Sequence, residues 1–164
     1  MSYETTLIYS EPLVRQAVLA FWRRSIGIGY VIALVVSAFI LGLLIAQGNT
    51  SWLIGSLATA LAFGVLIAAL LYVVHYRISL RKFREMGSPH ATFLVEEASF
   101  TIGSSIGTAT LQWSAIKELW QFSGVWLLLY SKAQFSTLPL TDLSPEMQAF
   151  ILQRVQAAGG KIVG

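Results

Sequence analysis

The chain has no cysteine among its 164 residues, which excludes disulfide bonds, thiolate catalysis and cysteine-ligated metal sites. It has two histidines, His75 and His90, and neither has a companion at the spacing that a metal site requires. Glu96 and Glu97 are adjacent, and successive side chains of a strand point to opposite faces, so acid–base cooperation between them is not expected. The sequence indicates no catalytic residue, metal or cofactor, and it predicts a protein that is not an enzyme.

Charged residues and histidine are missing from residues 26–74. A polar stretch at residues 47–51 divides this run into two halves, 26–46 and 52–74. Each half is long enough to cross a hydrocarbon core of roughly 30 Å as a helix. Because backbone groups inside a bilayer find no water to bond, both halves are expected to be helical. We therefore predict a membrane α-helical hairpin of two transmembrane helices at residues 26–86, including a basic cytoplasmic extension.

Most of the basic residues lie beside the predicted spans, and residues 47–51 carry none. The positive-inside rule therefore places both termini in the cytoplasm. A group of these residues is expected to contact the membrane surface, although setting the orientation of the spans is the simpler interpretation. The group consists of Arg23, Arg24, Arg77, Arg81, Lys82 and Arg84. Residues 90–164 carry a slight excess of acids, so the net charge of +3 indicates a membrane surface and no nucleic-acid partner.

Small residues recur at four-residue spacing in both predicted spans. Such stripes let helix backbones approach closely inside a bilayer. They predict helix packing, either between the two spans or across a homodimer. The residues are Gly29, Ala33 and Ser37 in the first span, and Ser56, Ala60 and Gly64 in the second.

The segment before the first span, residues 1–25, is predicted to form a short strand and a helix. Residues 3–9 favour a strand. Ser10 is a good N-cap for a helix with Glu11 and Pro12 in its first turn. This helix either leads into the first span or lies in the membrane interface.

Residues 87–164 are predicted to form a cytoplasmic α+β domain, since Gly87, Ser88 and Pro89 break the preceding helix. Short β-favouring runs alternate with turn residues, and Ser123 and Gly124 are typical of a tight hairpin. The predicted strands are residues 93–95, 99–102, 108–113, 117–122, 125–130 and 134–138, with connections at residues 103–105, 123–124 and 131–132. A final helix is predicted from Ser144 to the glycines at 159–160. Its predicted apolar stripe is Met147, Phe150, Ile151, Val155 and Ala158. The expected architecture is an antiparallel sheet closed by this helix.

Three tryptophans of this domain, Trp113, Trp120 and Trp126, form the most prominent aromatic group. Packing in the core is the simpler interpretation. The alternative is a partly exposed aromatic surface that binds a partner.

The chain resembles the YcxB-like family of bacterial membrane proteins. The residues that carry the resemblance are Phe93 followed by Glu96 and Glu97, Trp113 with Ile116, Leu138 and Pro139, and the helix start at residues 143–150. Family relatives often have an acidic turn ending in Asp-Gly where this chain has Glu96, Glu97 and Ala98. The resemblance implies a multi-pass protein of the bacterial inner membrane with a pleckstrin-homology-like (PH-like) domain, and it brings no catalytic residues. A PH-like antiparallel sheet or barrel closed by a C-terminal helix would need a seventh strand. We therefore hypothesise that residues 3–9 join this sheet.

The functional hypothesis is a small inner-membrane protein that anchors a non-catalytic PH-like domain, which binds another protein or lipid headgroups. The alternative is an immunity or regulatory protein whose membrane hairpin binds a toxin or a transporter. Membrane lipid and an unidentified protein are the expected partners, with a homodimer as a further possibility.

Overall fold

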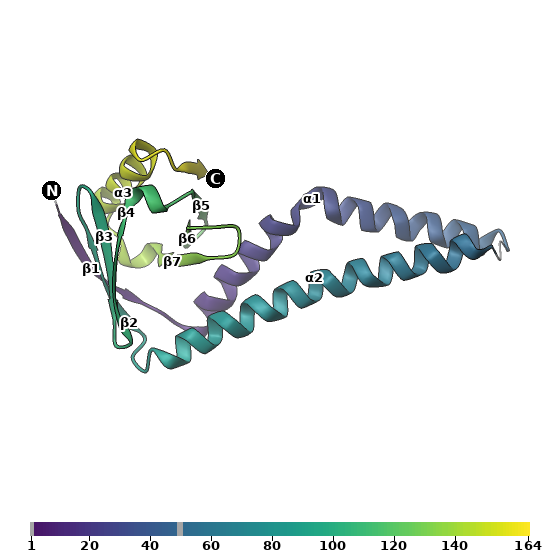
Figure 1. The fold of residues 1–164 in the computed structure, drawn as a ribbon, viewed down its shortest axis with the longest axis horizontal. Coiled ribbons are helices and arrows are strands. Elements are labelled where there is room, and N and C mark those ends of the chain that lie inside the picture. Colours follow the sequence, from purple (N-terminus) through teal and green to yellow (C-terminus); the bar gives the residue numbers. More distant parts are fainter. Residues whose placement is uncertain (1, 49–50) are drawn as a thin grey trace. The chain divides into compact units, whose positions relative to one another are not determined.

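The computed structural model describes residues 2–48 and 51–164 (Figure 1). The chain forms two compact units: a hairpin unit, Val18–Arg77, and a sheet unit, Met1–Ala17 with Ile78–Gly164. The helices are α1 (Glu11–Ala46), α2 (Trp52–Glu85) and α3 (Pro145–Ala157). The strands are β1 (Tyr3–Ile8), β2 (His90–Val95), β3 (Ser99–Ser104), β4 (Gly107–Gln112), β5 (Glu118–Phe122), β6 (Val125–Leu129), β7 (Phe135–Pro139) and β8 (Lys161–Val163). Two short 3₁₀ helices complete the fold, η1 (Trp113–Ala115) and η2 (Leu140–Asp142).

The two long helices, α1 and α2, are both long and apolar enough to cross a membrane, and no residue in the most apolar part of either is buried. This confirms the prediction of two long apolar helices. The predicted connection at residues 47–51 includes Asn49 and Thr50, which lie outside the described residues. One feature of α1 was not predicted: Gly27 has φ 73° and ψ 155°, so α1 consists of two helical segments joined at this glycine. A positive φ of this kind is accessible to glycine at little cost.

The beginning of α1 and the end of α2 agree with the sequence prediction. The backbone N–H of Leu13 donates to the Ser10 hydroxyl at 3.3 Å, which is the expected N-cap bond. At its other end, α2 continues to Glu85, and Gly87 follows with φ 64°. The glycine therefore stops the helix where the sequence predicted a break.

The first sheet has the strand order β1-β2-β3-β4, and all its neighbours are antiparallel. Strand β1 pairs with β2 along its whole length, from Tyr3 opposite Val95 to Ile8 opposite His90. This confirms the hypothesis that the N-terminal strand joins the sheet. The β3–β4 turn is shifted relative to the predicted connection at residues 103–105, because Gly103 stays within β3. A Cβ at Gly103 would lie 2.6 Å from the hydroxyl oxygen of Thr92, so a larger residue here would displace the Thr92 side chain.

The second sheet has the order β7-β6-β5-β8. Its β5–β6 hairpin turns at Ser123 and Gly124, as predicted, with Gly124 at φ 85°. Strand β8 was not predicted, and it pairs parallel to β5. Among the described residues, no strand ladder joins the two sheets, so of the predicted alternatives, a sheet or a barrel, the barrel is wrong. The coarser prediction, an antiparallel sheet domain with a C-terminal helix, is confirmed.

The core of the sheet unit lies between the first sheet, the second sheet and α3. The Ser144 hydroxyl accepts from the Met147 N–H at 3.2 Å and caps α3. Four of the five residues in the predicted stripe of α3 are buried, and Ala158 is exposed because it follows the last helical residue. The fully buried side chains of the core include Leu7, Phe93, Phe100, Ile116, Leu119, Leu128, Leu138 and Ile151.

Candidate functional site

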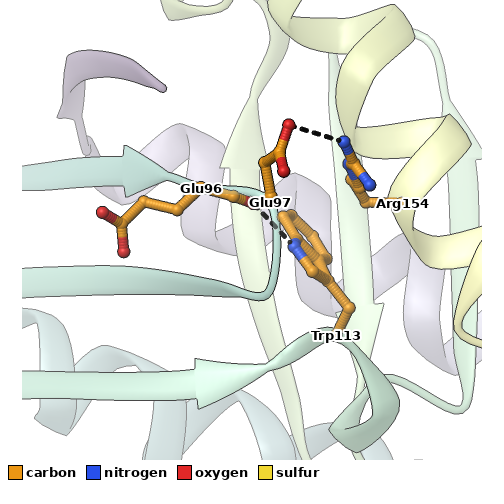
Figure 2. A network of polar contacts seen from close by, with 4 residues as sticks. All are labelled: Glu96, Glu97, Trp113 and Arg154. Carbon is orange, nitrogen blue, oxygen red and sulfur yellow. Dashed lines mark hydrogen bonds and ion pairs between the residues drawn. The ribbon is translucent and has the colours of Figure 1, made fainter. Parts of the chain in front are cut away.

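Trp113 connects η1 to the turn between β2 and β3 (Figure 2). Its indole Nε1–H donates to the carbonyl oxygen of Glu96 at 3.0 Å, and its backbone N–H donates to the carbonyl oxygen of Ala98 at 3.4 Å. The ring centroid lies 4.9 Å from that of Phe100, and only 3% of the residue is exposed. This tryptophan therefore holds the turn against the core.

Arg154 of α3 joins the same turn through Glu97 (Figure 2). Its Nη2 lies 3.4 Å from Oε1 of Glu97, and its guanidinium carbon lies 4.8 Å from the centroid of the Phe150 ring. The Glu97 side chain is 66% exposed, so the ion pair contributes little to stability. The carboxylate of Glu96 points away from that of Glu97 in Figure 2, and it accepts instead from the Ser99 hydroxyl at 3.3 Å. The arrangement orders a turn and places no two carboxylates together.

The three tryptophans named by the sequence do not form one cluster. Trp113 and Trp126 belong to the core. Trp120 lies on the other face of β5, because its neighbour Leu119 points into the core and successive side chains alternate. On that face, its Nε1–H donates to Oε2 of Glu118 at 2.6 Å. With exposures of 3% and 5%, Trp113 and Trp126 support the core-packing interpretation, whereas Trp120, 9% exposed, is buried on the opposite face of β5.

A second polar network joins the end of β1 to η2 and β7, and no local pattern in the sequence predicted it. The Ile8 N–H donates to Oδ2 of Asp142 at 2.7 Å, and the Thr5 hydroxyl donates to the Asp142 carbonyl oxygen at 2.8 Å. The Tyr9 hydroxyl donates to the carbonyl oxygen of Thr137 at 2.9 Å. These partners are more than 120 positions apart in the chain, so neither spacing nor periodicity could reveal them.

Two tyrosines near this network have perturbed titration. Burial raises the pKa of Tyr9 far above its ordinary value, and the nearby Tyr130 and Asp142 raise it further. Burial also raises the pKa of Tyr130, although the hydrogen bond from its hydroxyl to Ser136, 2.6 Å long, acts in the opposite direction. A phenol that stays protonated at neutral pH acts here as a hydrogen-bond donor and contributes no charge.

The basic residues predicted at the membrane surface lie on α1 and α2. Arg23, Arg77, Arg81, Lys82 and Arg84 are exposed, and Arg24 is half-buried. Nε of Arg81 lies 2.7 Å from Oε1 of Glu85, one turn further along α2. Lys82 and Arg84 lie in the last turn of this helix, where positive charge is favourable for the helix dipole.

The predicted small-residue stripes contribute unequally to the packing of the hairpin unit. A Cβ on Gly64 would lie 2.9 Å from Cδ2 of Leu34 and 3.2 Å from the hydroxyl of Tyr30. That hydroxyl also donates to the Gly64 carbonyl oxygen at 2.9 Å. Gly64 therefore marks the close approach of α1 and α2. Ser37 is half-buried, whereas the remaining members, Gly29, Ala33, Ser56 and Ala60, are exposed in this chain.

No group of three or more histidines and carboxylates that could hold a metal ion occurs in residues 2–48 and 51–164. His75 Nδ1 lies 2.8 Å from the carbonyl oxygen of Leu71 on the same helix, and His90 lies opposite Ile8 in the first sheet. The two histidines therefore take part in local structure.

Residues 95–153 match the model of the family described as YcxB-like protein. The resemblance stated from the sequence is thus confirmed over this segment. No curated protein and no solved structure matches the chain. Six of the residues that carry the resemblance belong to the core of the sheet unit: Phe93, Trp113, Ile116, Leu138, Leu143 and Phe150. The resemblance is therefore carried largely by residues that pack in the core of this chain.

Proposed function

We propose that this chain, whose residues 95–153 belong to the YcxB-like family, is a non-catalytic protein of the bacterial inner membrane. In this proposal α1 and α2 cross the bilayer, both termini are cytoplasmic, and the sheet unit is a PH-like domain that binds another protein or lipid headgroups. Strands β1 to β7, which lie in two sheets, precede α3, and this order supports the PH-like interpretation, although β8 follows the helix.

The pairing of β1 with β2 carries the proposal. Strand β1 precedes the first long apolar helix, and β2 follows the second. The six residue pairs between β1 and β2 form one ladder. The two ends of the hairpin must therefore lie on the same side of any membrane that the hairpin crosses. The exposed apolar surface of α1 and α2 supports the crossing itself, since water disfavours such surface and lipid tails do not.

The distribution of charge supports the cytoplasmic side and favours a protein as the partner. The basic residues flank the apolar segments, which is typical of cytoplasmic ends. Residues 90–164 carry slightly more acidic than basic residues, so the domain alone is a poor attractant for anionic lipid. Lipid contact is therefore assigned to the basic end of α2.

Cysteine labelling tests the topology, because the chain has no native thiol. One cysteine replaces Thr50, between the two apolar halves, and another replaces Lys132, which is exposed after β6. In intact cells an impermeant maleimide is expected to label Thr50→Cys only, and permeabilised cells should add Lys132→Cys. Labelling of Lys132→Cys but not of Thr50→Cys in intact cells would refute the proposed orientation.

Site-specific photo-crosslinking tests the binding role and separates it from the alternative. A photoreactive residue replaces exposed Ser114 or Gln153 in the domain, or exposed Val35 or Phe63 on the apolar helices. Adducts with a second protein from the domain positions support the proposal. Adducts from the helix positions alone favour an immunity or regulatory protein that binds a toxin or transporter through its hairpin. Absence of adducts at all four positions contradicts both.

The headgroup version of the proposal needs a separate measurement. Hydrogen exchange of β2–β4 in the full chain is compared between nanodiscs with neutral lipid and nanodiscs with anionic lipid. The proposal of a protein partner predicts the same exchange in both. Protection that appears only with anionic lipid would assign the domain to headgroup binding.

A further inference from the structure

Strand β4 (Gly107–Gln112) is the edge of the first sheet, and it pairs only with β3. Five of its six residues are exposed, and Leu111 is half-buried. Its turn with β3 carries Ile106, which is 62% exposed. The strand thus presents one side of its backbone without a neighbouring strand in the part of the chain that the structure describes.

The hydrogen-bond pattern identifies which backbone groups face outward. The Trp113 N–H donates to the Ala98 carbonyl oxygen, which continues the β3–β4 ladder by one pair beyond Ser99 and Gln112. Bonded and non-bonded pairs alternate in an antiparallel ladder, so Leu111, Ala109 and Gly107 bond to β3. The backbone N–H and C=O groups of Thr108, Thr110 and Gln112 consequently point away from the sheet.

The β2–β3 ladder gives the same assignment independently. The Glu96 N–H donates to the Ser99 carbonyl oxygen, so Ser99, Thr101 and Gly103 direct their backbone groups toward β2. The alternate residues of β3, including Phe100 and Ile102, then bond to β4. These are the partners of Leu111 and Ala109 in the observed register.

The edge lacks the features that usually prevent strand pairing. Residues 98–116 contain no charged residue and no proline. Charge, proline, bulges and covering elements are the usual means by which an edge strand is protected from pairing with another chain. Threonine at positions 108 and 110 instead favours extended backbone.

We propose that β4 pairs antiparallel with β4 of a second copy of this chain. The outward groups are symmetric about Thr110, so a two-fold axis places Thr110 of one copy opposite Thr110 of the other, and Thr108 opposite Gln112. Each of these pairs exchanges both N–H···O bonds, and the two first sheets become one continuous sheet. A contact of this kind uses the same surface on both copies, as closed dimers require.

The absence of charge on β4 favours a second copy over a foreign strand. Identical uncharged strands meet without like-charge repulsion, whereas a charged partner segment finds no complementary charge along this edge. Two copies anchored in one membrane also meet at high effective concentration, an argument that rests on the proposed anchoring. The pairing itself does not require that anchoring. This dimer is distinct from one formed by the small-residue stripes of α1 and α2.

Disulfide trapping in native membranes tests the register, since the chain has no native cysteine. Thr110→Cys brings two thiols together in a bonded pair with Cα atoms about 5.5 Å apart, which a disulfide can bridge. Thr108→Cys or Gln112→Cys alone separates them by four residues, roughly 13 Å. Thr6→Cys is the matched control, because Thr6 is an exposed threonine on β1 of the same sheet.

We expect disulfide-linked dimers from Thr110→Cys at least ten-fold more abundant than from the other three single variants. Co-expression of the Thr108→Cys and Gln112→Cys chains should restore the crosslink. Equal yields at all four positions indicate random collision and overturn the proposal, as does no crosslink at Thr110. Crosslinks of Thr110→Cys to another protein would assign the edge to a foreign strand and also overturn it.

Proline at the two-fold position gives a second test, by analytical ultracentrifugation of the full chain in detergent. Thr110→Pro removes an outward N–H and no backbone bond to β3, so the dimer should dissociate while circular dichroism stays unchanged. It also removes the 2.8 Å hydroxyl bond between Thr110 and Thr101 of β3, a loss that it shares with the control Thr110→Val. Thr110→Val keeps the N–H and should keep the dimer. If Thr110→Pro unfolds, Thr110→Lys replaces it, because two like charges would meet at the axis. A dimer that survives both Thr110→Pro and Thr110→Lys, or a wild type that is monomeric at every concentration, contradicts the proposal.

Discussion

The backbone N–H of Tyr9 donates to the carbonyl oxygen of Pro89 at 2.7 Å. These residues lie at the ends of β1 and β2 from which the chain enters α1 and leaves α2. The bond continues the β1–β2 ladder, so the two apolar helices form an insertion within one sheet. A fragment that begins after α2 lacks one strand of its domain, and experiments on this protein should therefore use the full chain.

Truncating Leu7, the side chain that β1 contributes to the buried core, should destabilise the sheet unit. Leu7 is fully buried in the core, so Leu7→Ala is expected to lower the free energy of unfolding by about 2–5 kcal/mol. Ile8, the next residue, is 54% exposed, and Ile8→Ala should change it by less than about 0.5 kcal/mol. Unfolding of the full chain in detergent, followed by tryptophan fluorescence, measures both. Equal effects of the two variants would show that β1 is not packed as described.

Much of this fold was predictable because its signals are local. Residues 3–9 and the six predicted runs after residue 93 all form strands, since β-favouring residues alternate there with turn residues. Ser144 caps α3 as its position before Pro145 predicted. The features that were missed are β8, which is too short to show a periodicity, and the break at Gly27. Gly27 lies among several glycines of an apolar run, and nothing in the sequence distinguishes it.

The indole hydrogen bond of Trp113 should contribute measurably to stability. Trp113→Phe keeps an aromatic ring beside Phe100 but leaves the Glu96 carbonyl oxygen without its donor. An unpaired, partly buried acceptor costs about 1–3 kcal/mol, and the unfolding free energy should fall by this amount. Glu96→Gln is the control, because the acceptor is the backbone and the side chain is exposed. If Trp113→Phe unfolds at the same denaturant concentration as wild type, the bond does not hold the turn.

The start of α3 should show a pH dependence that Ser144 controls. The pKa of Glu146 lies below its ordinary value of 4.5 because its carboxylate accepts two hydrogen bonds. The larger effect comes from the backbone N–H of Glu146 itself, and the smaller one from the Ser144 hydroxyl. The stability from these bonds is therefore present above about pH 4.5 and is lost as the pH falls through the lowered pKa. Ser144→Ala should raise the pKa of Glu146, as measured by carbon-13 NMR titration of its carboxyl group.

The same substitution removes the helix cap, and a second variant separates the two effects. Ser144→Ala should also lower the unfolding free energy at pH 7 by about 0.5–2 kcal/mol, because the Met147 N–H loses its acceptor. Ser144→Asp keeps an acceptor for this N–H but cannot donate to Glu146 when ionised. It should preserve the stability at pH 7 and still raise the pKa of Glu146. A pKa that is unchanged in both variants contradicts this assignment.

The candidate sites were less predictable than the fold, because they depend on which face a side chain occupies. Trp113, Trp120 and Trp126 are a group in the sequence, but one register of β5 and β6 places Trp126 in the core and Trp120 on the opposite face. The bond from the Trp113 N–H to the Ala98 carbonyl oxygen likewise fixes which residue pairs of the β3–β4 ladder are hydrogen-bonded. It thereby determines which backbone N–H and C=O groups of β4 point outward. Composition shows that residues 98–116 are uncharged; only the register shows which of them face outward.

The two glycines at positions 29 and 64 should respond differently to the same substitution. Gly64 lies against Leu34 and Tyr30, and its Cβ would already be 2.9 Å from Cδ2 of Leu34. Alanine is tolerable there because the end of a leucine side chain can move, but Gly64→Leu must separate the helices and break the 2.9 Å bond from the Tyr30 hydroxyl. Gly29 has no atom within 4 Å of its Cβ position, so Gly29→Leu should be accommodated.

Thermal unfolding in detergent and proteolysis at the hairpin provide the measurements for this pair. Gly64→Leu is expected to lower the unfolding midpoint by several degrees, corresponding to the typical overpacking cost of about 1–3 kcal/mol. Gly29→Leu should leave the midpoint of a monomer unchanged, since no atom lies within 4 Å of the Cβ position at Gly29. If Gly29→Leu is the more damaging of the two, its face of α1 packs against a second helix that the isolated chain does not contain. Such a result would assign the small-residue stripe of α1 to association between copies and leave Gly64 as the contact within each hairpin.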